Sequence, residues 1–211
     1  VDGDWISEVR MGTDDNSGPS GQPDLLEPDE NNPGSYILTD YKTYGSYKVS
    51  RLLGLVKSKA SHLTEVYARS GVWGKAGSPK QINVFTPTPE KVDISDEALQ
   101  LNHYRLLFQK RGYQISSMQL QVTVRDGGVQ IARERGIEDP MYLIPVPWID
   151  DVELETFFNN KHRALIQAIE TGIMPDPCTE AESWDRRRCK DYCDVSSFCP
   201  QGQRVAATGG S

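Results

Sequence analysis

Hydrophobic and polar positions recur along the chain at two spacings, which together predict a mixture of strands and helices. Alternating stretches and stretches rich in β-branched residues predict strands over residues 21–26, 35–42, 81–85, 113–125 and 141–148. Apolar positions three and four residues apart predict helices over residues 46–69, 95–111 and 151–171. Prolines in the last strand cannot donate to a ladder, so we expect it at a sheet edge. This order predicts an α/β fold with a central mixed β-sheet flanked by helices.

Length and composition indicate one folded domain with a small appendage. The chain has 211 residues, of which 37% are hydrophobic, and this excludes disorder of the whole chain. No apolar run reaches the ~18 residues of a membrane-spanning helix. We expect a core over residues 1–175, a cysteine-rich tail over residues 176–202 and a disordered tail over residues 203–211.

Charge is distributed unevenly, although the net charge of −7 taken alone argues against nucleic-acid binding. Residues 1–40 carry one basic and 10 acidic residues, whereas residues 41–80 carry 8 basic residues and one acidic residue. An acidic segment followed by a basic one suits a metal site beside a phosphate-binding surface. Two solvated faces of opposite sign would give the same distribution.

Two aspartates lie on neighbouring strands of a predicted hairpin. Asp24 follows Pro23, and Asp40 lies near the end of the next strand, two residues before Lys42. Residues two apart on a strand share a face, so an ammonium would lie beside a carboxylate. Carboxylate oxygens are the ligands that Mg²⁺ and Mn²⁺ prefer, and a nearby lysine can orient water against a phosphate. This set predicts phosphodiester hydrolysis, although each aspartate alone is typical of a turn.

A second polar pair lies on the helix predicted over residues 95–111. Gln100 and Tyr104 are four residues apart and therefore share a face of the helix. Their side chains suit hydrogen bonds to a phosphate or to a metal ligand. A polar helix face with a tyrosine at the edge of the core is the structural alternative.

These residues resemble the PD-(D/E)xK nuclease superfamily, most closely its RecB-like exonuclease branch, which includes the CRISPR-associated RecB-like iron–sulfur exonucleases. The resemblance is carried by the strings Gly-Gln-Pro-Asp-Leu-Leu over residues 21–26, Ile-Leu-Thr-Asp-Tyr-Lys-Thr over 37–43 and Gln-Leu-Asn-His-Tyr over 100–104. It implies a restriction-endonuclease-like core. It also implies that Asp24, Asp40 and the Tyr41 carbonyl bind the metal, that Lys42 is the catalytic lysine, and that Gln100 and Tyr104 form the branch's Gln-x-x-x-Tyr motif.

The chain departs from this branch upstream of the aspartates. Members usually have a helical region there that often bears a metal-binding histidine, but only 23 residues precede Asp24 and none is histidine. Glu8 is the nearest substitute ligand. We therefore expect the N-terminal part of the core to be incomplete or to lack that ligand.

All four cysteines lie in the last 34 residues, at Cys178, Cys189, Cys193 and Cys199. Clustering at one end suits a metal or cluster site in a reducing compartment better than a disulfide framework, so we expect a cytoplasmic protein. Irregular spacing without short paired knuckles favours a [4Fe–4S] cluster over zinc, with two disulfides as the third alternative. The resemblance also favours the cluster, although the branch usually has x2 where this chain has x3 between Cys189 and Cys193.

Aromatic residues are interleaved with the basic ones over residues 42–80, a pattern typical of proteins that bind single-stranded nucleic acid. An amphipathic helix with a basic solvent face explains the pattern equally well. On the first interpretation, the candidate DNA contacts are Lys48, Arg51, Lys57 and Lys59.

Taken together, these features predict a Mg²⁺- or Mn²⁺-dependent deoxyribonuclease, foremost an exonuclease acting on DNA ends or single strands. No Walker A loop occurs, so any helicase would be a separate chain, as would a recombination or CRISPR partner. The alternatives are a DNA- or protein-binding module of the same fold that does not cleave, a repair or restriction endonuclease, and a zinc-stapled interaction protein.

Overall fold

The structure is a computed structural model that describes residues 4–12 and 20–208. The last residues of the predicted tail, 209–211, lie outside the described residues. The chain divides into two compact units, Val1–Phe158 and Asn159–Ser211, so the division falls earlier than the predicted boundary near residue 175.

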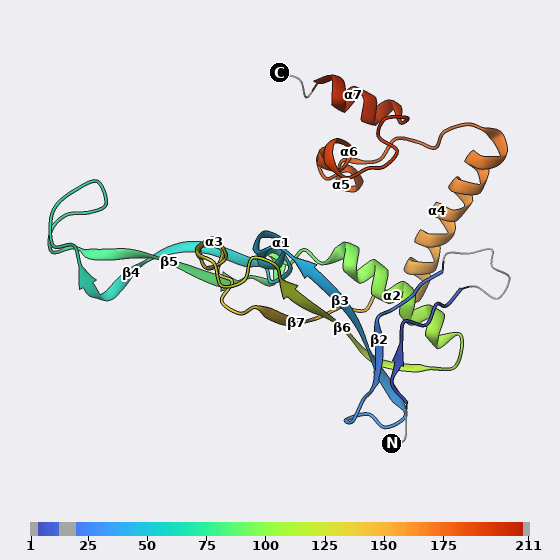
Figure 1. The fold of residues 1–211 in the computed structure, drawn as a ribbon, viewed down its shortest axis with the longest axis horizontal. Helices are drawn as coiled ribbons and strands as arrows, with labels where there is room; N and C mark the ends of the chain where they lie inside the picture. The colour runs from blue at the N-terminus through green and yellow to red at the C-terminus, as the bar shows by residue number, and fades with distance from the viewer. Residues whose placement is uncertain (1–3, 13–19, 209–211) are drawn as a thin grey trace. The chain divides into compact units, whose positions relative to one another are not determined.

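A five-stranded mixed sheet forms the centre of the first unit (Figure 1). Its strands are β1 (Ile6–Ser7), β2 (Leu25–Pro28), β3 (Ser35–Tyr44), β6 (Gln114–Val124) and β7 (Met141–Pro145). They lie in the order β1-β2-β3-β6-β7, with β3 and β6 parallel and the other pairs antiparallel. The predicted mixed sheet and its proline-containing edge strand β7 are confirmed.

Helix α2 (Ser95–Gln109) packs its apolar side chains into the core of this sheet. Leu101 and Phe108 of α2 are fully buried in one cluster with Leu38 of β3 and Leu120 of β6. Burial of such side chains stabilises the fold by ~1.5–3 kcal/mol each. The same packing fixes α2 against β3, the strand that carries Asp40 and Lys42.

The helix predicted over residues 46–69 is wrong beyond its first turns. Helix α1 (Ser46–Leu52) ends just before Gly54, and the chain then forms a two-stranded antiparallel ribbon of β4 (Leu55–Val66) and β5 (Pro79–Pro87) (Figure 1). Gly54 has a φ of +61°, and a Cβ there would lie 2.5 Å from the Thr88 carbonyl oxygen. No other residue fits this turn without strain, so the helix must end here. A short 3₁₀ turn, η1 (Pro89–Lys91), leads from the ribbon to α2.

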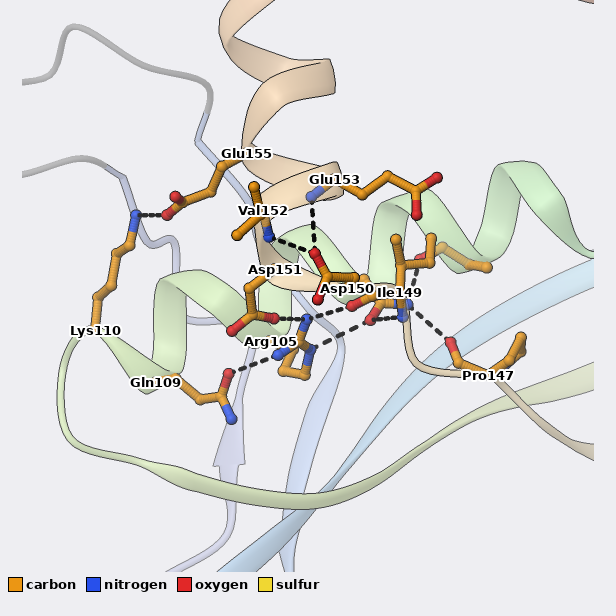
Figure 2. Close-up of polar contacts among 12 residues, drawn as sticks. Arg105, Gln109, Lys110, Pro147, Ile149, Asp150, Asp151, Val152, Glu153 and Glu155 are labelled. Carbon is orange, nitrogen blue, oxygen red and sulfur yellow. Dashed lines mark hydrogen bonds and ion pairs between the residues drawn. The ribbon is translucent and has the colours of Figure 1, made fainter.

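A buried arginine connects α2 to the start of α4 (Asp151–Thr171), as Figure 2 shows. Arg105, only 1% exposed, donates to the side chains of Gln109 and Asp151 and to the carbonyl of Ile149, at 2.6–3.1 Å. Asp150 accepts hydrogen bonds from the backbone of residues 152 and 153, so it caps α4. A one-turn helix, α3 (Gln130–Arg133), lies between β6 and β7.

The second unit contains the later part of α4 and three short helices, α5 (Glu180–Ser183), α6 (Arg187–Asp191) and α7 (Pro200–Thr208). A capping box between Thr179 and Glu182 begins α5. Residues 203–208, predicted to be disordered, instead complete α7. Over the described residues, no helix is long and apolar enough to cross a membrane.

Candidate active site

The β2–β3 hairpin brings the two predicted carboxylates together. Leu25 pairs with Thr39, which places Asp24 beside Asp40 at the end of β2. Asp24 Oδ2 accepts a hydrogen bond of 2.6 Å from the Tyr41 backbone N–H. The backbone of β3 therefore holds the Asp24 side chain, but Asp24 lies just before β2 and not on the strand predicted over residues 21–26.

Asp40 is the most constrained of these carboxylates, with only 3% of its surface exposed. Its Oδ2 lies 2.6 Å from Lys42 Nζ as an ion pair, yet this buried oxygen accepts no hydrogen bond from the described residues. Burial raises the pKa of Asp40 above its ordinary 3.8, Lys42 opposes this rise, and the Asp24 carboxylate adds to it. A nearby cation stabilises the charged form of such a buried carboxylate.

Lys42 begins a chain of hydrogen bonds that runs to α2. Its Nζ donates to Gln100 Oε1 at 3.0 Å, and Gln100 Nε2 donates to the Tyr104 hydroxyl at 2.7 Å. Among the described residues, none accepts the hydroxyl proton of Tyr104. That proton is therefore left to donate to a ligand such as a phosphate oxygen.

The Tyr104 ring is positioned by a close approach to Gly21. A Cβ on Gly21 would lie 2.3 Å from Tyr104 Cδ1, so only glycine leaves room for the ring. Gly21 is itself fixed by two backbone hydrogen bonds of 2.7 Å with Met11. The segment that leads into Asp24 thus also sets the position of Tyr104.

A buried carboxylate on α2, three residues before Gln100, was not among the residues predicted from the sequence. Glu97 of α2 is 4% exposed, accepts a hydrogen bond from the Tyr44 hydroxyl at 3.0 Å and forms an ion pair with Lys48 at 3.0 Å. Burial, followed by the charge of Glu97, raises the pKa of Tyr44. The available signal was spacing, since Glu97 precedes Gln100 by three residues and shares its helix face.

Glu8, the predicted substitute ligand, lies next to Asp24 along the backbone. Its N–H donates to the Asp24 carbonyl at 3.2 Å, and its φ of 54° is a rare left-handed conformation for a residue other than glycine. Its side chain is exposed. Over the described residues, no group of three His, Cys, Asp or Glu side chains is placed to hold a metal.

The residues therefore supply two carboxylates in contact rather than a complete set of protein ligands. Mg²⁺ keeps several waters and is commonly bound by one or two carboxylates, so Asp24 and Asp40, whose Oδ2 already lies 2.6 Å from Lys42 Nζ, are the two side chains that fit this ion. The Tyr41 carbonyl stays a predicted third ligand. Burial of the Asp40 carboxylate, which raises its pKa, favours positive charge beside it, and Lys42 supplies one such charge.

The predicted DNA-contact residues lie in two settings. Lys48 is paired with Glu97, and Arg51 with Asp93 at 2.5 Å. Lys57 and Lys59 lie on the exposed ribbon and, among the described residues, form no ion pair. Lys57 and Lys59 are therefore better candidates for contacts with DNA phosphates than Lys48 and Arg51.

The four cysteines of the second unit have free thiols and form no disulfide. The Cys178 carbonyl accepts a hydrogen bond of 2.9 Å from Gln201 Nε2, which links the segments that carry Cys178 and Cys199. The thiols do not converge on a common ligand position in the described part of the chain. The presence of four thiols therefore supports a metal site in this tail, but their positions do not.

Comparison with protein-family models, curated proteins and solved structures found no match for this chain.

Proposed function

We propose that this protein is a metal-dependent deoxyribonuclease with a restriction-endonuclease-like core, and that it acts as an exonuclease on DNA ends or single strands. The observation that carries the proposal is one connected polar row. It runs from Asp24 and Asp40 through Lys42 and Gln100 to Tyr104. These residues come from three separate segments of the chain, and a merely solvated polar surface gives no reason for them to meet beside a buried carboxylate.

Each residue has a role that its contacts support. Asp24 and Asp40 hold Mg²⁺ or Mn²⁺, which supplies a more acidic bound water and neutralises phosphate charge. Lys42 orients the attacking water and offsets negative charge that develops on the phosphate. Gln100 holds the Lys42 ammonium in place. Tyr104 donates its free hydroxyl proton to a phosphate oxygen.

The cysteine tail enters the proposal as a structural element. Four free thiols in one small unit are donors that select an iron–sulfur cluster or zinc, and we favour the [4Fe–4S] cluster. No step of cleavage is assigned to it. A separate helicase, recombination or CRISPR-type chain would supply unwound ends, and the reducing conditions that free thiols need suit the cytoplasm.

The test is cleavage of end-labelled single-stranded and duplex DNA by the full chain with Mn²⁺. We expect the wild-type protein to shorten labelled strands and Lys42→Ala to lower the rate by about 100-fold or more. Lys110→Ala is the matched control, because Lys110 is an exposed lysine paired with Glu155. Equal activity of wild type and Lys42→Ala would overturn the assignment of the site.

Circular DNA separates exonuclease from endonuclease action. A covalently closed substrate should resist the wild-type protein while its linearised form is degraded. The second candidate is a binding module that does not cleave, and the specific observation in its favour is that no third His, Cys, Asp or Glu side chain of the described residues joins the two carboxylates as a metal ligand. DNA binding without cleavage in Mg²⁺ or Mn²⁺ would select that candidate.

A further inference from the structure

The β4–β5 ribbon has two chemically different faces. Residues directly opposite each other in an antiparallel pair project from the same side. Lys57 pairs with Phe85, Lys59 with Asn83, and Ser61 with Gln81. The residues between them, which project from the other side, carry no charge: Val56, Ser58, Ala60, Ile82, Val84 and Thr86. We call the side formed by Lys57, Lys59, Ser61, Gln81 and Asn83 the ribbon face; all five of these residues are exposed.

The ribbon is basic in an acidic protein. Residues 55–87 contain five basic residues and one acidic residue, whereas the whole chain has a net charge of −7. The acidic residue, Glu65, already pairs with Lys80 at 2.9 Å. Lys57 Nζ lies over the Phe85 ring, 5.8 Å from its centre, and Lys57 is exposed. The positive charge of the ribbon face is therefore uncompensated in the described residues.

The ribbon also has the dimensions of an element that binds duplex DNA. The regularly paired part of β4, Leu55–Ser61, has seven residues, which at a rise of about 3.4 Å span about 24 Å. A two-stranded ribbon fits the major groove of duplex DNA, which is about 12 Å wide. An isolated pair of strands is only marginally stable, so a partner along this face would add to its stability.

The side chains of the ribbon face match what such a groove presents. Lysine binds phosphate oxygens or guanine, and asparagine and glutamine form bidentate hydrogen bonds with adenine. Gln81 Nε2 already donates to Ser61 Oγ at 3.2 Å, so the two strands present their polar groups together. A face made only for solvation would not need amides between its lysines.

We propose that the ribbon face binds duplex DNA in the major groove, with Lys57 and Lys59 on phosphates and Gln81 and Asn83 on base edges. This deepens the proposed function, on which it rests for the choice of DNA as ligand. The ribbon would hold the duplex behind the end that is cleaved. Trp73, 84% exposed near the tip, offers stacking for unpaired bases instead, so single-stranded DNA is the outcome to be distinguished.

The test is binding of a fluorescent duplex of about 20 base pairs, two helical turns, measured by anisotropy without added divalent cation. Lys57→Ala/Lys59→Ala should weaken duplex binding about tenfold or more and reduce the slope of log K against log salt by about two. Lys57→Arg/Lys59→Arg should restore the slope. Arg163→Ala/Lys190→Ala removes the same charge from two exposed positions of the second unit and should leave the slope unchanged.

Gln81→Ala/Asn83→Ala should keep the salt slope and reduce the spread of affinities among duplex sequences. An unchanged slope in Lys57→Ala/Lys59→Ala, an equal loss in the Arg163→Ala/Lys190→Ala control, or binding of single strands alone would overturn the proposal. Because binding is read without cleavage, the two proposals fail separately. If the protein does not cleave DNA but Lys57→Ala/Lys59→Ala reduces the salt slope, the ribbon face binds DNA and the nuclease proposal is wrong. If the protein cleaves DNA but the slope is unchanged in that variant, the nuclease proposal stands and the ribbon-face proposal is wrong.

Discussion

Lys42 Nζ donates a hydrogen bond to Gln100 Oε1 at 3.0 Å, although 58 residues separate them in the chain. The bond joins β3 to α2 and holds the ammonium next to the buried Asp40 carboxylate. Gln100 in turn donates to Tyr104, so one amide sets the position of two groups that would face a phosphate.

Replacing Gln100 with leucine should break this link without emptying the space it fills. We expect Gln100→Leu to lower the rate of cleavage about 10- to 100-fold, because Lys42 and Tyr104 lose their common partner. The rate is measured on labelled DNA at saturating substrate. Gln130→Leu is the control, since Gln130 is exposed and its side chain donates a hydrogen bond to Glu134. A similar loss in both variants would contradict a positioning role for Gln100.

Asp40 should destabilise the fold in the absence of a cation. The pKa of Asp40 is raised in the folded state. The loss of folding stability that this causes is therefore absent below the ordinary pKa of 3.8 and grows as the pH rises through the pKa of the folded state. Asp40→Asn should therefore have a higher melting temperature than wild type at pH 7 without metal, and the difference should narrow towards pH 4. Added Mn²⁺ should stabilise wild type by about 2.7 kcal/mol at 100 times its Kd, but should not stabilise Asp40→Asn.

Thermal melts across pH check this prediction. Asp139→Asn, at an exposed position, is the matched control and should show neither effect. A lower melting temperature for Asp40→Asn at pH 7 without metal would mean that the ion pair with Lys42 outweighs the burial of Asp40.

Gly21 should be intolerant of even a methyl group. In Gly21→Ala the new Cβ would lie 2.3 Å from Tyr104 Cδ1, so the ring must move away from its hydrogen bond with Gln100. We expect a loss of stability of about 1–3 kcal/mol and a loss of cleavage larger than that instability explains. Urea melts and cleavage assays below the melting range check both effects. Gly71→Ala, where a Cβ would meet nothing within 4 Å, should change neither.

Local patterns predicted most of the central sheet and the principal residues of the site. The β2–β3 hairpin, α2, β6, β7 and α4 occur where alternation, apolar spacing or a capping aspartate indicates them. Asp40 and Lys42 are two residues apart on one strand, so their shared face follows from strand geometry alone. The bond from Lys42 to Gln100 does not follow from local pattern, because it depends on how α2 packs against β3.

The helix predicted over residues 46–69 failed for a physical reason. Val49, Leu52, Leu53 and Val56 repeat at helical spacing, but only Val49 and Leu52 are buried on α1. The residues after Gly54 gain their hydrogen bonds from β5, more than ten residues further on, and local spacing carries no information about that pairing. Glu97 was missed in the same way, since its partners Tyr44 and Lys48 lie on other elements.

Arg105 should be among the most sensitive positions for stability. Arg105→Met removes the donors that satisfy the Ile149 carbonyl and the Gln109 amide oxygen inside the first unit (Figure 2). We expect a loss of about 3 kcal/mol, equivalent to a fall of about 6–12 °C in melting temperature. Lys110→Met removes an exposed ion pair with Glu155 and should cost less than about 1 kcal/mol. Equal effects in urea melts would contradict a structural role for Arg105.

The cysteine tail should bind metal and fold more firmly when it does. The thiols are free and do not meet among the described residues, so binding would have to draw the four thiols together and order the segments between them. Protein prepared without oxygen should contain iron and acid-labile sulfide in equal amounts, about four of each per chain, and its tail should resist protease. Zinc without sulfide would select the zinc alternative. Cys178→Ser should lower the metal content and restore protease sensitivity, whereas Ser197→Ala should not. If the tail holds neither iron nor zinc, and protease cuts it equally in wild type, Cys178→Ser and Ser197→Ala, the cysteines are not metal ligands. That result would leave the proposal for the carboxylate site of the first unit unaffected.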